Sequence, residues 1–537
     1  MAILRNWAGG IDNLSPADRI PDGYVRAMVN LDPLPGGGLG LRGGAEQLLA
    51  CADCRGAFAV GRYLVIADGA RLLSYSLDAG SVAELTASLP DGPLTASELN
   101  AQLYLSTPAA QYRTDGVRLV RWDVPPPAFT AAALPGGSLA GQYKVAVTAL
   151  GEDGEESGAV PLVVTMDGAR LQVISDDPRP LRLYVSPADS ASLYYQGQIL
   201  GGVALIEAPT DDKARLTTAH LDTMPPSELL VSHHSVLVGA VGRYVFLSEP
   251  MMPHLTNPVT RFFQYGSDVQ ALVPTDSGVF VVLADRTYHL TGVETEAPSQ
   301  RHIDNIGGLA GSGVALPDGT AAWFSRHGLV IGGSDGSTAA PSRSRHAPMQ
   351  AERAACGVLE HQGVIRVVAC LQGDVWANPR ARFSDALEDV TYAVALDTGA
   401  VTLYQGFAFE GFTGRDGASF AWKADGVYRL GVVVDEAAPI DARAEFPATD
   451  FGTNAVKRLQ TAWLALDTDG QATLQVAVDG GPHHPHRVLG TAGTRKAPLA
   501  RGLLGRRWTF TLELLEASHA ALDSIEVEAG AAQRRIK

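Results

Sequence analysis

Residues 409–432 read FEGFTGRDGASFAWKADGVYRLGV. Aromatic and β-branched residues form short runs here, and Asp-Gly pairs at 416–417 and 425–426 interrupt them. Asp-Gly tolerates the positive φ angles of a tight hairpin turn. Val, Tyr, Phe and Trp favour the pleated, half-buried surface of a sheet. The stretch therefore predicts short antiparallel strands joined by tight turns.

The same unit returns along the chain. Further copies lie at 57–77, 229–248, 269–292, 313–336 and 355–371, with Asp-Gly pairs at 68–69, 115–116 and 318–319. We find no amphipathic helical pattern longer than about three turns. Units at spacings of about 40–50 residues are typical of propeller blades. The spacing is irregular and no blade motif repeats, so we predict an all-β, irregular β-propeller, with a multi-sheet sandwich as the alternative.

Residues 125–226 differ from their surroundings. They begin at Pro125-Pro126-Pro127 and end at Pro225-Pro226, and GQYKVAVTALGEDGEESGAV at 141–160 alternates before an acidic turn. Glu155-Glu156 in that turn is interpreted as solvated. With a strand pair at 181–195, the stretch resembles a fibronectin type III module. We predict a sandwich of this kind inserted into the repeats.

The remaining segments complete the predicted domain organisation. Residues 1–50 contain few core-forming runs and are expected to be an extended arm that packs on a neighbouring blade or subunit. Deletion of residues 1–40 should then impair assembly more than folding. Residues 51–124 and 227–440 are assigned to propeller blades. Residues 441–537 contain alternating runs at 462–481, 505–517 and 522–530, which predict a closing β-sandwich.

Charge is unevenly distributed. The chain has 537 residues and a formal net charge of −16, and hydrophobic residues make up 46% of it. Before Asp441 there are 30 Lys and Arg against 47 Asp and Glu, and from there on 12 against 11. An acidic surface repels phosphates, which argues against a general nucleic-acid binder. The start lacks the apolar run of a signal peptide, and no run of about 18 apolar residues occurs. We therefore expect a soluble chain made in the cytoplasm.

Few residues suggest chemistry. Cys51 and Cys54 have metal-ligand spacing but lack a second such pair, so ordinary thiols are favoured over zinc. His483-His484-Pro485-His486 suggests a solvated loop, and His233-His234 suggests strand surface or core. Gly36–Gly38 and 332–336 lack the Lys-Ser/Thr of a phosphate loop, and neither G-x-S-x-G nor H-E-x-x-H occurs. We predict no catalytic residues, cofactor or metal, and hence no enzyme.

Basic pairs mark the C-terminal segment. They are Lys457-Arg458, Arg506-Arg507 and Arg534-Arg535. Solvated strand ends or ion pairs with a neighbouring subunit are the favoured interpretation. The alternative is a lining for a DNA path, because such side chains contact phosphates without reading sequence.

The opening of the chain carries a resemblance. The residues concerned are Gly9-Gly10, Asn13, Ser15-Pro16, Ile20-Pro21-Asp22-Gly23, Arg26, Asn30-Leu31-Asp32, Gly36-Gly37-Gly38, Leu41-Arg42 and Gly44. Further matches are Phe246-Leu247-Ser248, Pro253, Pro258, Arg261-Phe262, 269–272, 278–281, 288–292, 525–528 and Arg534-Arg535-Ile536. Together these resemble the tail nozzle, or packaged-DNA stabilisation, proteins of tailed phages. The inserted fibronectin-like module departs from the shortest members of that family.

The resemblance implies a structural role in the virion tail. Such proteins assemble as rings, sixfold by resemblance, beneath the portal and adaptor, meet tail fibres or spikes, retain packaged DNA and open for ejection. An acidic channel wall would let DNA slide, because repulsion prevents adhesion. One alternative is a trimeric baseplate or receptor-binding protein that contacts the host surface. Another is a glycan hydrolase on a propeller, which needs clustered acidic residues that the sequence does not display.

Overall fold

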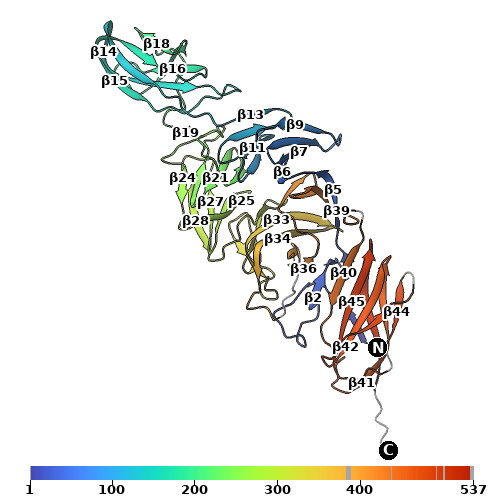
Figure 1. Cartoon of the computed structure of the whole chain (residues 1–537). Helices are drawn as coiled ribbons and strands as arrows, with labels where there is room; N and C mark the ends of the chain where they lie inside the picture. The colour runs from blue at the N-terminus through green and yellow to red at the C-terminus, as the bar shows by residue number, and fades with distance from the viewer. Residues whose placement is uncertain (1, 383–388, 437, 491–492, 500–501, 532–537) are drawn as a thin grey trace, which may run out of the picture. The chain divides into compact units, whose positions relative to one another are not determined.

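The computed structural model describes residues 2–382, 389–436, 438–490, 493–499 and 502–531 (Figure 1). Within these ranges the regular elements are strands, and no segment forms a helix. The all-β prediction is therefore confirmed.

Among the described residues, six of the sheets are four-stranded and antiparallel. Five of them follow chain order: β6 (Cys54–Val60), β7 (Tyr63–Asp68), β8 (Arg71–Ser76) and β9 (Val82–Thr86); β10 (Thr95–Leu99), β11 (Gln102–Ser106), β12 (Gln111–Thr114) and β13 (Leu119–Arg121); β20 (Leu229–His233), β21 (Val236–Val241), β22 (Tyr244–Leu247) and β24 (Phe262–Gln264); β25 (Val269–Thr275), β26 (Gly278–Leu283), β27 (Thr287–Thr291) and β28 (Ser299–Asp304); β29 (Gly313–Ala315), β30 (Ala321–Ser325), β31 (Gly328–Gly332) and β32 (Thr338–Ala339).

A sixth four-stranded sheet joins distant parts of the sequence. It contains β37 (Gly411–Arg415), β38 (Ala418–Lys423), β39 (Gly426–Val432) and, at its edge, β5 (Gly44–Ala50). Asp416 and Gly417 form the predicted tight turn with φ angles of 51° and 77°. In the antiparallel pairing of β39 with β5, Leu430 lies opposite Ala45. The hairpins of the opening stretch are therefore present, and an N-terminal strand completes their sheet.

Two larger sheets contain the C-terminal strands. The nine-stranded sheet has the order β33 (Gln350–His361), β34 (Val364–Trp376), β35 (Thr391–Ala395), β36 (Val401–Tyr404), β2 (Ala27–Val29), β40 (Ile440–Glu445), β45 (Trp508–Ala517), β42 (Gln471–Val478) and β43 (His484–Arg487). The six-stranded sheet has β3 (Leu31–Pro33), β4 (Leu39–Leu41), β46 (Ala520–Ala531), β41 (Lys457–Thr468) and β44 (Thr494–Pro498), with β1 (Ala2–Arg5) also on β46. A single core of buried side chains, including Leu464, Phe510 and Ile525, lies between their strands.

The expectation of an extended N-terminal arm is wrong. Strand β1 pairs with β46, and β2 lies between β36 and β40 in the nine-stranded sheet. In Figure 1 the N-terminus accordingly lies among the C-terminal strands. Seven large apolar side chains of this segment are buried in the same core: Trp7, Ile11, Val25, Met28, Leu31, Leu39 and Leu41. Residues 2–50 are thus an integral part of the fold, because their strands pair with strands of the same chain that lie about 400 residues later.

The segment 125–226 forms a five-stranded sheet of its own. Its order is β17 (Tyr194–Ile199), β16 (Leu181–Val185), β14 (Thr130–Ala149), β15 (Leu162–Ile174) and β18 (Val203–Ile206). The pairing of β14 with β15 is irregular between Pro135 and Ala140. A Cβ atom on Gly137 would lie 2.3 Å from the carbonyl carbon of Ala169, so this bulge requires glycine. The strands form one continuous sheet, whereas the fibronectin-like prediction implies two. Strands β19 (Asp222–Thr223) and β23 (Leu255–Thr256) pair separately.

The chain divides into two compact units that alternate along the sequence. One contains residues 1–57, 280–289 and 302–537, and the other residues 58–279 and 290–301. The division does not follow the predicted domain boundaries. The predicted N-terminal arm, the blades after residue 302 and the C-terminal strands all belong to the first unit.

The core of the first unit contains a neutral histidine. His346 is buried, its ring packs edge-on against Tyr392, and burial lowers its pKa to about 3. In the unfolded chain the same group has a pKa of about 6.5. The unfolded chain therefore takes up this proton at a higher pH than the folded chain does. The free energy of unfolding is unaffected by protonation of His346 above pH 6.5 and falls as the pH is lowered from 6.5 towards 3.

We predict that the free energy of unfolding falls by about 2 kcal/mol when the pH is lowered from 7.5 to 5, because His346 takes up a proton only when the chain unfolds. Urea titrations of the wild-type protein and the His346→Phe variant at both pH values measure this term. The variant should lose less stability by that amount, since it cannot take up the proton. An equal loss in both proteins would show that His346 is not protonated on unfolding.

Candidate functional site

The basic residues predicted at a DNA path or interface have different environments. Lys457 is buried, and its ammonium group donates to the backbone carbonyls of Thr453, Ala455 (2.9 Å) and Arg506 (3.3 Å). Because this amine is enclosed by backbone acceptors, it cannot reach a phosphate. The prediction that Lys457 lies at a DNA path or a subunit interface is therefore wrong. Its ammonium group instead binds the backbone carbonyls around the start of β41.

Arg458, Arg506 and Arg507 are exposed. The backbones of Lys457 and Gly505 form an antiparallel β-bridge. The pairs Lys457-Arg458 and Arg506-Arg507 therefore lie next to each other. The guanidinium of Arg507 lies 2.9 Å from the Asp18 carboxylate, so that cation is already paired within the chain. Arg534 and Arg535 lie outside the described residues.

The predicted histidine loop is partly a strand. His484–Arg487 forms β43 and pairs with β42, with His486 opposite Leu474. His486 is buried, and burial lowers its pKa. Only His483 and the preceding turn match the solvated loop that the Gly-Gly-Pro sequence indicates.

Cysteine chemistry is suppressed by burial. Cys356 and Cys370 lie on the paired strands β33 and β34, and burial raises the pKa of both thiols, that of Cys370 to about 11. A thiol in that state is neither a nucleophile nor a ready metal ligand. Cys51 and Cys54 belong to no group of three metal-capable side chains within the described residues.

The acidic turn of the 125–226 module is not simply solvated. The Arg113 guanidinium on β12 forms ion pairs with Asp153 and Glu155. Burial raises the pKa of Glu155, and Arg113 opposes that shift. Tyr184 donates a hydrogen bond of 2.7 Å to Glu156. Asp153 and Glu155 thus connect the module to the sheet of β10–β13, whereas the Glu156 carboxylate is bonded within the module.

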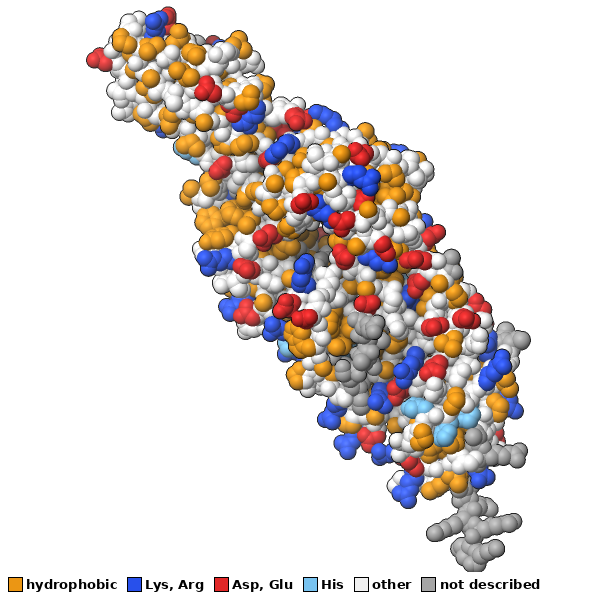
Figure 2. All heavy atoms as spheres, in the orientation of Figure 1, with side chains coloured by type: hydrophobic (Ala, Val, Ile, Leu, Met, Phe, Trp, Pro, Cys, Tyr) orange, Lys and Arg blue, Asp and Glu red, His pale blue; other side chains and the backbone are white. Residues whose placement is uncertain are grey.

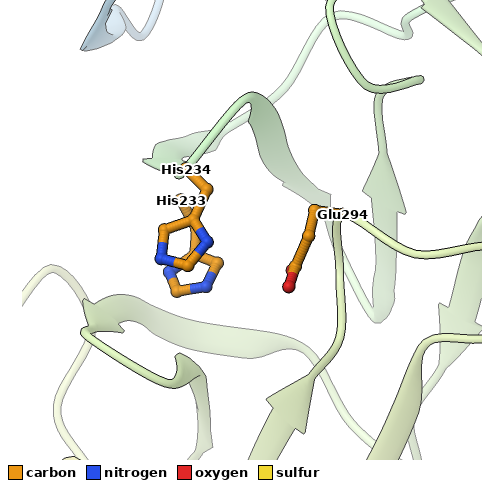
Figure 3. Close-up of side chains that lie close together, drawn as sticks. All are labelled: His233, His234 and Glu294. Carbon is orange, nitrogen blue, oxygen red and sulfur yellow. The ribbon is translucent and has the colours of Figure 1, made fainter.

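One group of side chains has the composition of a metal site. His233 ends β20, His234 lies in the turn that leads to β21, and Glu294 lies between β27 and β28. One ligand atom from each lies within 4.8 Å of the others, and this is the only such group in the described ranges. The two imidazole rings stack with centroids 4.1 Å apart, and the Glu294 carboxylate lies beside them (Figure 3).

The partners of these groups suit metal binding. Burial and the adjacent His234 lower the pKa of His233, which hydrogen-bonds to the backbone of Thr275. One carboxylate oxygen of Glu294, Oε2, is buried and has no hydrogen-bond partner. The sequence suggested only strand surface or core for His233-His234. Glu294 follows sixty residues later, so no local pattern could have indicated the group.

A buried arginine positions the loop that carries Glu294. The Arg261 guanidinium donates to the carbonyls of Val293 (2.6 Å) and Thr295 (2.8 Å), the two neighbours of Glu294. It also donates twice to the Ser248 carbonyl, at 3.0 and 2.7 Å. Two of these four charge-assisted bonds hold the backbone on either side of Glu294, and the other two hold the guanidinium on Ser248.

A cavity of about 460 Å³ lies in the first unit. Residues from β29, β33 and β37 line it, including Val314, Cys356, Val358 and Phe412. These are the first strands of three successive sheets. The lining is mostly apolar, with Glu360, Arg415 and Asp416 as its charged members, and the raised pKa of the Cys356 thiol makes it a poor nucleophile.

The visible surface mixes charges of both signs. In Figure 2 acidic and basic side chains are interspersed, and neither forms a continuous field. The 125–226 module exposes apolar side chains, notably Leu200 (77%), Val160 (63%), Val163 (59%) and Leu205 (51%). No helix in the described residues has the length and apolar character needed to cross a bilayer.

Comparisons with known proteins assign no family. No family model and no curated protein matches the chain. A chain of the mitotic checkpoint complex aligns at 8% identity over 73% of this chain and 94% of that chain, with a TM-score of 0.29. The extracellular domain of a putative one-component system from B. thetaiotaomicron aligns at 9% over 95% and 97%, with a TM-score of 0.26. Dipeptidyl peptidase 4 of Porphyromonas gingivalis aligns at 10% over 75% and 58%, with a TM-score of 0.28. Scores this low assign neither fold nor function.

Proposed function

We propose that this chain is a structural protein of a phage tail, a nozzle or conduit subunit and not an enzyme. It would form a homo-oligomeric ring below the portal and adaptor of the virion, with six subunits as in the proteins that it resembles. This ring would retain the packaged DNA and let it pass during ejection. The observation that supports this most is the resemblance of residues 9–44 to such proteins.

The residues that carry this resemblance have structural roles in the chain. Gly10 packs so closely on Val401 that a Cβ atom would lie 2.5 Å from the Val401 nitrogen. Asn13 exchanges two hydrogen bonds with the backbone of Ala347, at 2.9 and 2.8 Å. Asn30 accepts from Arg42 at 2.8 Å and donates to the Asp441 carbonyl at 2.7 Å. A pattern of this kind specifies architecture rather than chemistry, which favours a scaffold.

The finer fold that we propose is an irregular β-propeller. Its blades would be the four-stranded sheets, and β5 completes the one formed by β37–β39. Successive antiparallel sheets in chain order, and closure by a strand from the other end of the chain, are the topology of such folds. The cavity lined by β29, β33 and β37 supports an inner face made by first strands.

Two further modules complete the proposed architecture. Residues 125–226 would be the inserted fibronectin type III-like module, here with its strands in one continuous sheet. Strands β40–β46, together with β1–β4, would be the closing sandwich. The charge of −16 suits a conduit wall, since acidic side chains keep DNA from adhering.

A receptor-binding or baseplate role is the second candidate. The apolar side chains exposed on the 125–226 module, such as Leu200, Val203 and Leu205 beside the β17–β18 turn, favour it, because a protein partner would cover them. Tail fibres, spikes or a host surface would then be the partner.

A nonsense mutation in the gene for this chain separates the two functions. A conduit predicts heads that package DNA and then lose it, measured as the DNA content of purified particles. Stable, DNA-filled particles that fail only to adsorb to cells would contradict the conduit and favour the second candidate.

A further inference from the structure

We propose that His233, His234 and Glu294 form a binding site for a divalent transition metal, with Zn²⁺ as the expected ion. Two imidazoles and one carboxylate are the ligand set of many zinc sites that keep a fourth position for water. No other group of three metal-capable side chains occurs in the described residues.

Geometry brings the ligands close to a bound arrangement. The ligand atoms lie within 4.8 Å of one another, and zinc bonds of about 2.0–2.1 Å would place them roughly 3.3 Å apart. Rotation about side-chain torsion angles would bring the ligand atoms this much closer. The stacked rings must rotate out of parallel, and the exposed His234 is free to do so, whereas His233 is held by its bond to Thr275.

Two of the three ligands, His233 and Glu294, are prepared by their surroundings. The bond from His233 to the Thr275 backbone is of the kind that fixes the tautomer of a metal-bound histidine. Glu294 supplies a buried oxygen without a hydrogen-bond partner, and this costs free energy unless a cation or donor occupies the space. Arg261 fixes the loop on both sides of that carboxylate. The backbone position of Glu294 therefore does not depend on the ion.

A bound ion would join two sheets. His233 and His234 belong to the β20–β21 hairpin, whereas Glu294 lies in the loop between β27 and β28. Because the unfolded chain does not bring the ligands together, binding free energy adds to folding stability. The expected role is thus a metal staple that strengthens the contact between these sheets.

The test uses the full chain freed of metal by a chelator. Calorimetric titration with Zn²⁺, and the visible absorption of bound Co²⁺, measure affinity and coordination. We expect one ion per chain with the strong absorption of a tetrahedral site, and an unfolding temperature that rises with Zn²⁺. Glu294→Gln and His234→Asn should weaken binding at least roughly 10-fold. Asparagine suits the latter position because His234 has φ +50°, which asparagine tolerates.

The matched control is the double variant His483→Ala/His484→Ala, which removes the other histidine-rich segment. It should bind Zn²⁺ like the wild-type protein. Circular dichroism of each metal-free variant shows whether it is folded. The proposal is overturned if the wild-type chain binds no ion, if Glu294→Gln and His234→Asn keep full affinity, or if the control variant abolishes binding.

Discussion

Removal of residues 2–41 is expected to prevent the first compact unit from folding. This segment supplies β1, β2, β3 and β4, and its seven large apolar side chains are buried in the core shared by the two larger sheets. At about 1.5–3 kcal/mol per side chain, their burial contributes on the order of 10 kcal/mol. That is comparable to the whole stability of a typical domain, about 5–15 kcal/mol. Loss of soluble expression and of cooperative unfolding measures the effect.

Two controls separate folding from a defect in assembly. The Ile3→Ser substitution changes an exposed side chain of β1 (49% accessible) and should leave unfolding unchanged. A peptide of residues 2–41 added to the truncated chain should restore cooperative unfolding, because β-strand pairing can form between fragments. A truncated chain that folds normally and fails only to oligomerise would support the arm that the sequence suggested, and would contradict the structure.

The Arg366→Met substitution is expected to destabilise the protein by about 3–5 kcal/mol. Arg366 and Asp32 are both fully buried, with the guanidinium Nε 3.5 Å from the carboxylate. The Tyr404 hydroxyl lies 2.9 Å from both carboxylate oxygens, and Arg366 also donates to the Pro33 carbonyl at 2.9 Å. Burial raises the pKa of Asp32, and Arg366 opposes this. Without Arg366 the buried carboxylate keeps the Tyr404 hydroxyl but loses its ion-pair partner.

A double-mutant cycle tests this explanation. Asp32→Asn alone leaves the cation unpaired, whereas Asp32→Asn with Arg366→Met removes both charges and keeps a group that Tyr404 can bond. The double variant should therefore be more stable than the sum of the single losses indicates. Urea denaturation of the four proteins supplies the numbers. Strict additivity would mean that the two groups do not interact.

Local patterns predicted the hairpins and missed what depends on distant residues. The turn at Asp416-Gly417 and the alternation of Tyr143, Val145 and Val147, all buried, follow from rules that act within a few residues. Strands β2 and β3 have three residues each, too few for a periodic signal, and their partners lie across the chain. Residues 1–50 therefore seemed to lack a core.

The site residues show the same limit. Lys457-Arg458 reads as one basic pair, yet alternation along β41 buries the first side chain and exposes the second. The side chain of Glu294 reaches His233-His234 only because a loop of another sheet returns there. Spacing along the sequence contains no trace of such a juxtaposition.

The symmetry of the purified assembly tests the central claim most directly. Native mass spectrometry of the full chain, alone and with its portal and adaptor, measures the number of subunits. The conduit predicts a closed ring, six subunits by resemblance. A trimer would contradict the conduit and favour a receptor-binding protein, and a chain that stays monomeric with its partners present would contradict both.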